Sequence, residues 1–385
     1  MTDTKIRLAR DTKLAAGAAA LAIAIAGSPL AAATSGSAMA QSKEMATTQA
    51  GGLSISAGVG WHYIDLPETK FTLLLENPVD GQSDQTIEKF TDHDGDFNGY
   101  RFDGAVNDIM TVSPFGTPVT LGVKGFYAEL DSSKSLVCDG FPNNGVDCST
   151  SFLFDPSPIF DNKGDASGLD SRTRRKVYHW GVAAEGKTPA TEMYGAQVQL
   201  KGGAAFRQFD QSLHLSNTEV VDNPGNTPNE SADYSEDLET DYWGAYLGLI
   251  KTFALFQGVN LVLDGEAGIY YTETDYSGRL VYDFNSGGSG SSSQSFTQLL
   301  SLSDDDVAFI GALNAQIDTD IGFGTASLFA LGEYYSSAPR MVYADADTNT
   351  EDADNPTGGL VQRTEIKDDD AWTLTLGGRV TVPIH

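Results

Sequence analysis

The chain has 385 residues, of which 24 are Lys or Arg and 53 are Asp or Glu, so its formal net charge at pH 7 is −29. This excess of acid argues against nucleic acid as a partner, because binding to phosphates needs basic patches. After residue 40, no segment reaches the roughly 18 apolar residues of a membrane helix. A chain of this kind crosses a membrane only as a closed β-barrel, in which strand pairing satisfies every backbone polar group.

Residues 1–40 have the three parts of a secretory signal peptide. The basic segment contains Lys5, Arg7, Arg10 and Lys13. An apolar stretch rich in Ala, Leu and Ile follows, and the sequence Ala-Met-Ala at residues 38–40 has the form of a cleavage site. We therefore predict an exported protein with a short periplasmic segment over 41–51. An N-terminal membrane anchor is the alternative, which Pro29 disfavours.

Ten segments of the remaining chain alternate apolar and polar residues with a period of two, the pattern of strands with one apolar face. In the clearest one, Val198 and Leu200 share a face, while Gln199 and Lys201 share the other. In chain order the segments are 52–66, 96–108, 117–130, 173–186, 193–209, 240–252, 257–273, 305–318, 321–335 and 370–384. A membrane strand needs about 9–11 residues. The predicted fold class is therefore all-β, as one closed antiparallel transmembrane β-barrel over 52–385.

The connections between these segments alternate in length. Long ones cover 67–95, 131–172, 210–239, 274–304 and 336–369, and short ones cover 109–116, 187–192, 253–256 and 319–320. Long extracellular loops and short periplasmic turns are the layout of an outer-membrane barrel. Two further apolar runs, 71–75 and 279–282, either extend hairpins above the membrane or raise the strand number from ten to twelve.

Aromatic residues lie at the strand ends next to the long connections, as a membrane-interface girdle requires. They are Trp61, Tyr63, Tyr100, Phe102, Tyr127, Tyr178, Trp180, Phe206, Tyr242, Trp243, Tyr270, Tyr271, Phe309 and Trp372. Candidates for a second girdle on the periplasmic side are Tyr194, Phe253, Phe256 and Phe323. A soluble β-sandwich is the alternative, but its strands are usually shorter, about 5–6 residues.

With these alternating segments and girdles, the chain resembles the porin-like outer-membrane β-barrel proteins of Gram-negative bacteria. The resemblance is one of architecture and covers all of the mature chain. It implies a location in the outer membrane, contacts with outer-membrane lipid and lipopolysaccharide, and insertion by the outer-membrane assembly machinery. Many members end in an aromatic residue, whereas this chain ends Val-Pro-Ile-His at residues 382–385, so the subfamily stays open.

Two polar segments suggest covalent or metal bonds. Cys138 and Cys148 lie close together, and in an exported protein such a pair most often forms a disulfide. Segment 92–99 contains D-x-D-x-N-G, the first half of a calcium loop. Its oxygen ligands would be Asp92, Asp94, Asp96 and Asn98. An EF-hand has Glu at the twelfth position, where this chain has Ala105, so a polar turn is the alternative, and we expect no other cofactor.

Charged side chains on the inner face of the barrel are the candidate pore lining. They are Arg101, Asp103, Lys124, Arg175, His179, Glu185, Lys201, Arg207, Asp264, Glu266 and Arg379. Both signs are present, so these residues either line a narrow pore or pair across the lumen. Barrels of about eight strands are filled by side chains, and those of about 16–18 leave an open channel. We predict a porin-like protein with a small, cation-favouring passive pore, whose preference comes from acidic connections at its mouth.

Two other functions stay open. One is a closed barrel that displays acidic surface loops for adhesion or envelope stability. The other comes from a resemblance to the omptin proteases, ten-stranded barrels with paired aspartates and a His-Asp dyad at the extracellular rim. Here the candidates would be His62, His179 and Asp103. No catalytic motif is matched, so our expectation is that the chain is not an enzyme.

Overall fold

The computed structural model describes residues 52–66, 69–78, 87–93, 96–138, 146–152, 169–219, 230–285, 293–342 and 365–384. The chain divides into two compact units, and all of these residues belong to the second, Ala46–His385. The predicted signal peptide and the segment 41–51 lie outside the described residues and stay predictions. Within the described part, no helix is long and apolar enough to cross a membrane.

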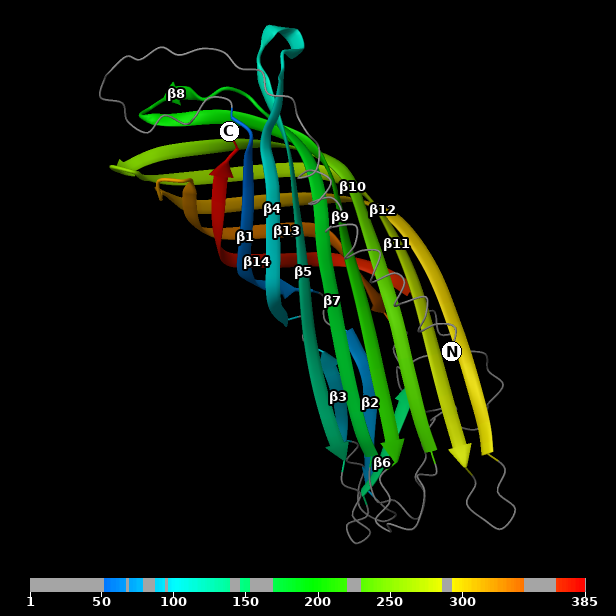
Figure 1. The fold of residues 1–385 in the computed structure, drawn as a ribbon. Helices are drawn as coiled ribbons and strands as arrows, with labels where there is room; N and C mark the ends of the chain where they lie inside the picture. Colours follow the sequence, from blue (N-terminus) through cyan, green and yellow to red (C-terminus); the bar gives the residue numbers. More distant parts are fainter. Residues whose placement is uncertain are drawn as a thin grey trace, which may run out of the picture. The chain divides into compact units, whose positions relative to one another are not determined.

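Ten antiparallel strands close into a barrel (Figure 1). They are β1 (Ser54–Asp65), β4 (Asp96–Val112), β5 (Val119–Cys138), β7 (Leu169–Lys187), β9 (Ala196–Glu219), β10 (Glu230–Phe256), β11 (Val259–Asn285), β12 (Ser293–Asp320), β13 (Thr325–Val342) and β14 (Glu365–Pro383). Each of these strands pairs with the next along the chain, and β1 pairs with β14 to close the sheet. The predicted ten-stranded antiparallel barrel is confirmed.

The other described elements lie outside this ring of strands. A short strand, β8 (Thr191–Met193), forms a hairpin with the start of β9, and η1 (Pro114–Gly116) is a single 3-10 turn between β4 and β5. Three strands, β2 (Thr69–Pro78), β3 (Ile87–His93) and β6 (Val146–Phe152), make a separate sheet. The run 71–75 therefore belongs to β2 and the run 279–282 is part of β11, so neither adds a strand to the barrel.

The strand register sets the tilt of the barrel. From His62 the pairing can be followed around the sheet in both directions, and the two paths reach Leu302 and Asn314 of β12. These residues are 12 positions apart, which is the shear of the barrel. Ten strands with this shear tilt by about 40° from the barrel axis, within the range that closed barrels adopt.

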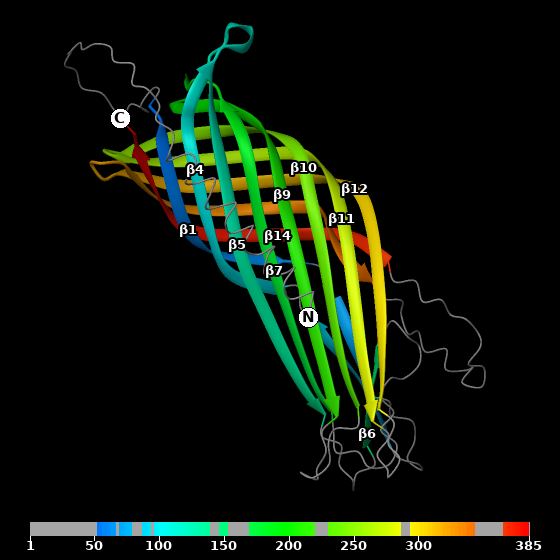
Figure 2. The same ribbon diagram turned by 45° about the vertical axis from the view of Figure 1, so that its right-hand side comes forward.

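Six neighbouring strands, β5, β7 and β9 to β12, run far beyond the length that a membrane requires. β5 has 20 residues and β7 has 19, and β9, β10, β11 and β12 have 24, 27, 27 and 28. Figure 2 shows them continuing side by side past the closed barrel. The long loops predicted over 210–239 and 274–304 are therefore wrong for most of their length. The sheet persists there because its inner face stays buried and keeps apolar side chains, as at Leu213, Leu215 and Tyr234, among polar ones such as Gln211.

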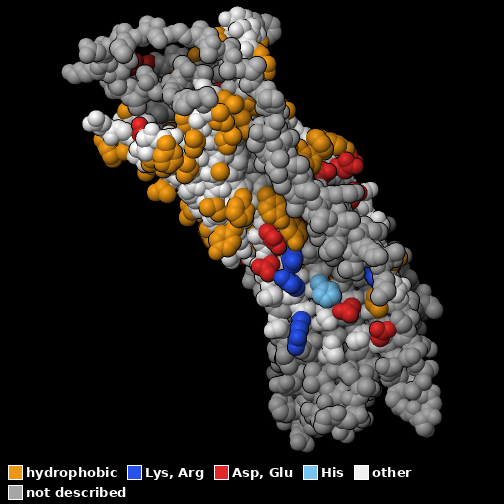
Figure 3. All heavy atoms as spheres, viewed as in Figure 1, with side chains coloured by type: hydrophobic (Ala, Val, Ile, Leu, Met, Phe, Trp, Pro, Cys, Tyr) orange, Lys and Arg blue, Asp and Glu red, His pale blue; other side chains and the backbone are white. Residues whose placement is uncertain are grey.

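The outer face of the closed barrel carries an apolar band. Its exposed side chains include Ile55, Val59, Leu200, Leu247, Leu249, Leu263, Leu313, Ile317, Leu328, Leu374, Leu376 and Val380. Figure 3 shows apolar side chains gathered over the barrel and charged ones beyond it, toward the extended strands. Water-soluble monomers rarely expose so large a continuous apolar surface. The band therefore faces lipid.

Aromatic side chains mark the extracellular edge of the band, as predicted. Trp61, Tyr100, Phe102, Tyr127, Trp243, Tyr271, Phe309 and Trp372 are all exposed there. The prediction is wrong for Tyr242 and Tyr270, which point inward and are fully buried. Each stands next to an outward-facing aromatic residue in sequence, and neighbouring residues of a strand face opposite sides, so only one ring of each pair can belong to the girdle.

Candidate functional site

The periplasmic half of the barrel encloses a cavity of about 960 Å³. Its wall includes Ser54 and Thr381 at the strand ends, and Pro118 and Pro189 in the short turns. The cavity therefore opens on the side of the short turns. Toward the extracellular side its wall ends at a layer that contains Arg101, Phe126, Arg207 and Glu333.

Glu333 on β13 links two arginines from other parts of the barrel. Arg101 on β4 donates from Nη1 to Glu333 Oε2 (2.6 Å), and Arg207 on β9 donates from Nη1 to Glu333 Oε1 (2.5 Å). All three side chains are almost fully buried, with 7% exposure or less. Arg101 also donates from Nε to Asp103 Oδ1 (3.2 Å) and stacks over the Phe126 ring at 3.8 Å. Charge-assisted hydrogen bonds thus cross the lumen at this level.

A second set of ion pairs lies deeper in the cavity. Glu266 Oε2 accepts from Lys201 Nζ (2.5 Å) and from Lys124 Nζ (3.1 Å), and its Oε1 accepts from Arg207 Nη2 (3.3 Å). Lys124 lies 3.2 Å from Glu185 Oε2. The remaining pairs are Lys187–Glu185 at 2.9 Å and Lys201–Asp264 at 2.7 Å.

The two sets join through Arg207 into one network of ten side chains. Its cations are Arg101, Lys124, Lys187, Lys201 and Arg207, and its anions are Asp103, Glu185, Asp264, Glu266 and Glu333. The formal charges of these described residues cancel. The network itself is therefore electrically balanced, in contrast to the net charge of −29 on the chain.

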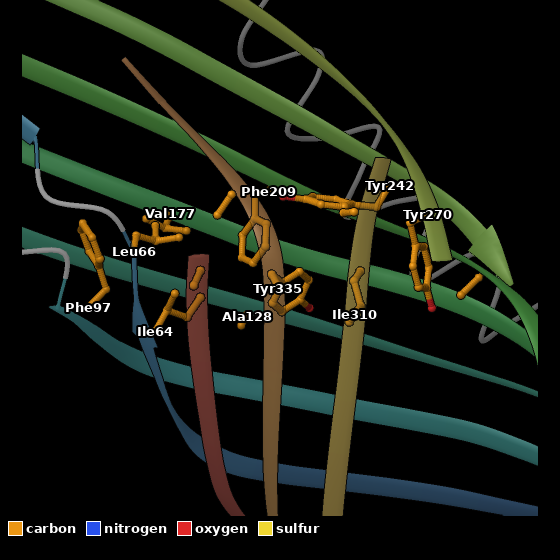
Figure 4. Close-up of a cluster of buried hydrophobic side chains, with 14 of the residues drawn as sticks. Ile64, Leu66, Phe97, Ala128, Val177, Phe209, Tyr242, Tyr270, Ile310 and Tyr335 are labelled. Atoms are coloured by element: carbon orange, nitrogen blue, oxygen red, sulfur yellow. The ribbon is translucent and has the colours of Figure 1, made fainter. Parts of the chain in front are cut away.

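On the extracellular side of this network, the interior of the barrel contains buried apolar side chains. Every one of the ten barrel strands contributes to one apolar cluster, which we call the seal (Figure 4). From β1 to β14 its members include Ile64, Phe97, Leu130, Val177, Phe209, Tyr242, Tyr270, Ile310, Tyr335 and Ala371, each at most 2% exposed. Phe209 lies at its centre, with ring centroids of Tyr335 and Tyr242 at 5.0 and 5.9 Å. Buried side chains from the whole circumference of the barrel thus meet at this level.

Two histidines are built into the seal. His62 on β1 and His179 on β7 are fully buried and stacked, with ring centroids 5.7 Å apart. His62 Nδ1 lies 2.8 Å from Thr375 Oγ1, and His179 Nε2 lies 3.0 Å from the Tyr335 hydroxyl. The rings of Phe209 and Phe126 pack against His179, with centroids at 4.2 and 4.6 Å.

Most of the predicted lumen residues lie together in the cavity. The cavity wall includes Arg101, Asp103, Lys124, Glu185, Lys201, Arg207, Asp264, Glu266 and Arg379. His179 lies in the seal, and Arg175 lies on its extracellular side, where Nη2 donates to Gln211 Oε1 (2.5 Å). The sequence reasoning missed Glu333, because β13 is apolar on both faces and its facing was ambiguous. Glu333 is the only carboxylate in β13, and this was the signal that could have identified it.

The proposed protease constellation does not form. Asp103 is bonded to Arg101 on the cavity side, while His62 and His179 contact each other in the seal. Neither histidine has a carboxylate hydrogen-bond partner among the described residues, so a His-Asp dyad is absent from this part of the chain.

The calcium and disulfide predictions remain untested. Asp92 lies in β3, and Asp96 and Asn98 lie in β4 rather than in a loop, where Asp96 accepts a hydrogen bond from the Tyr63 hydroxyl. Asp94 lies outside the described residues. Among those that are described, no three His, Cys, Asp or Glu side chains are placed to hold a metal ion. Cys138 ends β5 and Cys148 lies in β6, and their side chains are outside the described part.

Solved structures of bacterial outer-membrane barrels are similar to this fold. The outer membrane protease OmpT of Escherichia coli is 9% identical, with a TM-score of 0.35 over 86% of this chain and 97% of that chain. A Pseudomonas aeruginosa FadL homologue is 7% identical (TM-score 0.22, 87% and 91% covered). The transport unit of the Escherichia coli autotransporter AIDA-I is 9% identical (TM-score 0.26, 88% and 93% covered). No protein-family profile and no curated protein sequence matches the chain.

These structures are bacterial outer-membrane proteins, the group that the sequence resembles, and they name no subfamily. They also correct one expectation, that the chain is not an enzyme, because one of the similar barrels is a protease. Barrels of this architecture include enzymes, so we withdraw that expectation. At 9% identity the similarity concerns the fold and assigns no activity to this chain.

Proposed function

We propose that this outer-membrane barrel is sealed at neutral pH and presents an acidic extracellular surface, rather than conducting solutes as a passive pore. The observation that carries the proposal is the seal, to which all ten barrel strands contribute buried side chains. Ten strands give a lumen narrow enough for side chains to fill. The balanced ion pairs on its periplasmic side provide no excess negative charge that would favour cations.

The surface beyond the apolar band supports the second half of the proposal. Outward-facing strand positions on the extracellular side of the girdle carry carboxylates on eight of the ten barrel strands. They include Asp65, Asp96, Glu129, Asp131, Asp210, Glu239, Asp241, Glu273, Asp275, Asp305 and Asp370. Rigid strands hold these groups in place, so the protein presents a fixed acidic surface just outside the membrane. Such a surface suits adhesion or envelope stability through cationic partners.

Single-channel recording tests the sealed state. The mature protein, refolded into a planar bilayer at pH 7.5, should show no conductance steps. The double variant Phe209→Ala/Tyr335→Ala removes two rings from the centre of the seal and should conduct in discrete steps.

The matched control is Phe206→Ala on the same strand, where the ring packs at a tilt against Trp243 on the outer face, with 4.3 Å between centroids. This variant should stay silent. Discrete steps from the folded wild-type protein at pH 7.5 would rule out the sealed barrel and restore the passive pore.

A further inference from the structure

The hydrogen bonds around the histidine pair in the seal assign its tautomers. Arg207 Nη1 lies 2.9 Å from the Tyr335 oxygen and can only donate to it, because a guanidinium has no acceptor. The Tyr335 hydroxyl hydrogen finds its acceptor in His179 Nε2 at 3.0 Å, so we assign the hydroxyl as the donor. With this assignment His179 carries its proton on Nδ1, which lies 3.4 Å from His62 Nε2 and donates to it. His62 in turn donates from Nδ1 to Thr375 Oγ1 at 2.8 Å.

This one-way chain uses all four ring nitrogens with both histidines neutral. A proton added to His179 would sit on Nε2 and face the Tyr335 hydroxyl hydrogen. A proton added to His62 would sit on Nε2 and face the Nδ1–H of His179. In either case two donors would point at each other inside an apolar layer, where an unsatisfied polar group is costly.

The charged groups around the pair also oppose a further positive charge. Arg101 on β4 and Arg207 on β9 are the nearest cations, and the one carboxylate beside them, Glu333 on β13, is already bonded to both. β5 and β14 present only uncharged side chains, Phe126 and Thr375. The remaining titratable groups beside the seal are Arg175, whose guanidinium lies over the Phe97 ring at 4.9 Å, Asp103, which is bonded to Arg101 on the cavity side, and the neutral hydroxyls of Tyr242, Tyr270 and Tyr335.

We propose that acid opens the seal, so that protonation of His62 and His179 turns the closed barrel into a pore. This inference rests on the proposed function, since it requires a lumen that is closed at neutral pH. Protons reach the pair from the periplasmic side, because Phe126 and Arg207 line the cavity and lie next to the pair.

The steepness with which pore opening depends on pH follows from the number of histidines that bind a proton. An imidazole in water titrates near pH 6.5, and the sealed state admits no proton on either ring. Below about pH 6.5, each histidine therefore shifts the open-to-sealed ratio by about tenfold per pH unit. Two histidines give up to about 100-fold per pH unit.

The test is single-channel recording of the refolded mature protein between pH 8 and 4.5, with the same buffer on both sides. Wild-type protein should be silent at pH 7.5 and conduct in discrete steps at pH 5. The double variant His62→Gln/His179→Gln keeps hydrogen-bonding groups that do not titrate, and it should stay silent throughout. The matched control is His214→Gln on the outer face of β9, where the imidazole is 59% exposed, and this variant should open like the wild type.

The outcomes separate this inference from the proposed function. Silence of the folded wild type at every pH overturns the acid-opened pore and leaves the sealed barrel standing, whereas conductance at pH 7.5 removes both. Acid opening that persists in the double variant overturns the role of the histidines. If the double variant does not fold, His62→Gln alone gives the decision, because one remaining histidine should reduce the slope to about tenfold per pH unit. An unchanged slope overturns the inference.

Discussion

Replacement of Glu333 by Gln should be among the most destabilising single changes in the barrel. The carboxylate is 3% exposed and accepts from Arg101 at 2.6 Å and from Arg207 at 2.5 Å. A glutamine amide offers one acceptor, so its NH₂ group would face the second guanidinium, and two buried cations would share no anion. Breaking one side of a buried ion pair costs about 3–5 kcal/mol. We expect Glu333→Gln to lower the free energy of unfolding by that amount.

The assay is urea unfolding of the protein in lipid vesicles, followed by tryptophan fluorescence. The matched control makes the same chemical change at the surface, in Asp131→Asn, whose partner Arg174 lies 3.4 Å away. Both of these side chains are more than half exposed. Exposed pairs contribute about 0–1 kcal/mol. If Glu333→Gln cost no more than Asp131→Asn, the reasoning that places a desolvated charge network across the lumen would be refuted.

Two further predictions concern the outer face and the extracellular rim. Leu247→Arg puts a charge on the lipid-facing side of β10 and should destabilise the barrel by about 2–4 kcal/mol in the same assay. The control is Ser303→Arg on β12, which lies beyond the girdle and should change stability by about 0.5 kcal/mol or less. Burial and the nearby Asp306 and Asp304 raise the pKa of Asp368, so its charged form opposes folding near neutral pH. Asp368→Asn keeps an oxygen for the Ser337 hydroxyl and should stabilise the protein at pH 7, with a gain that shrinks as the pH falls and the native carboxyl is protonated. A variant that gains equally at pH 7 and at low pH would contradict this.

The barrel could be predicted from the sequence because lipid imposes a strict period of two. Lys201 and Arg207 fix the facing of β9, since a shift by one residue would place both in hydrocarbon. The same pattern identified most of the cavity wall. The alternating pattern failed for β13, because Glu333 lies on the inner face beside Leu331 in a strand that is otherwise apolar. Glu333, the partner of Arg101 and Arg207, was missed for that reason.

The seal and the extended strands could not be predicted from alternation alone. Ile64, Phe97 and Val177 lie on the inner face of the barrel. In the sequence they are apolar residues near the ends of strands, and nothing in the alternation shows that they contact one another. Whether such side chains meet across a lumen depends on the shear of 12, which is set by pairings between distant segments. In the extended part the inner face mixes apolar and polar residues, as at Leu213 and Gln211, and the mixture resembles a loop.

The order of the buried charges along the chain has a consequence for how the barrel is assembled. All five cations of the balanced network lie on β4, β5, β7 and β9, together with two of its anions, Asp103 and Glu185. The other three anions, Asp264, Glu266 and Glu333, lie on β11 and β13. Before the two edge strands meet, the sheet thus carries opposite charge on its earlier and later halves. The attraction between the halves acts across the space that becomes the lumen, so it draws the open sheet toward closure.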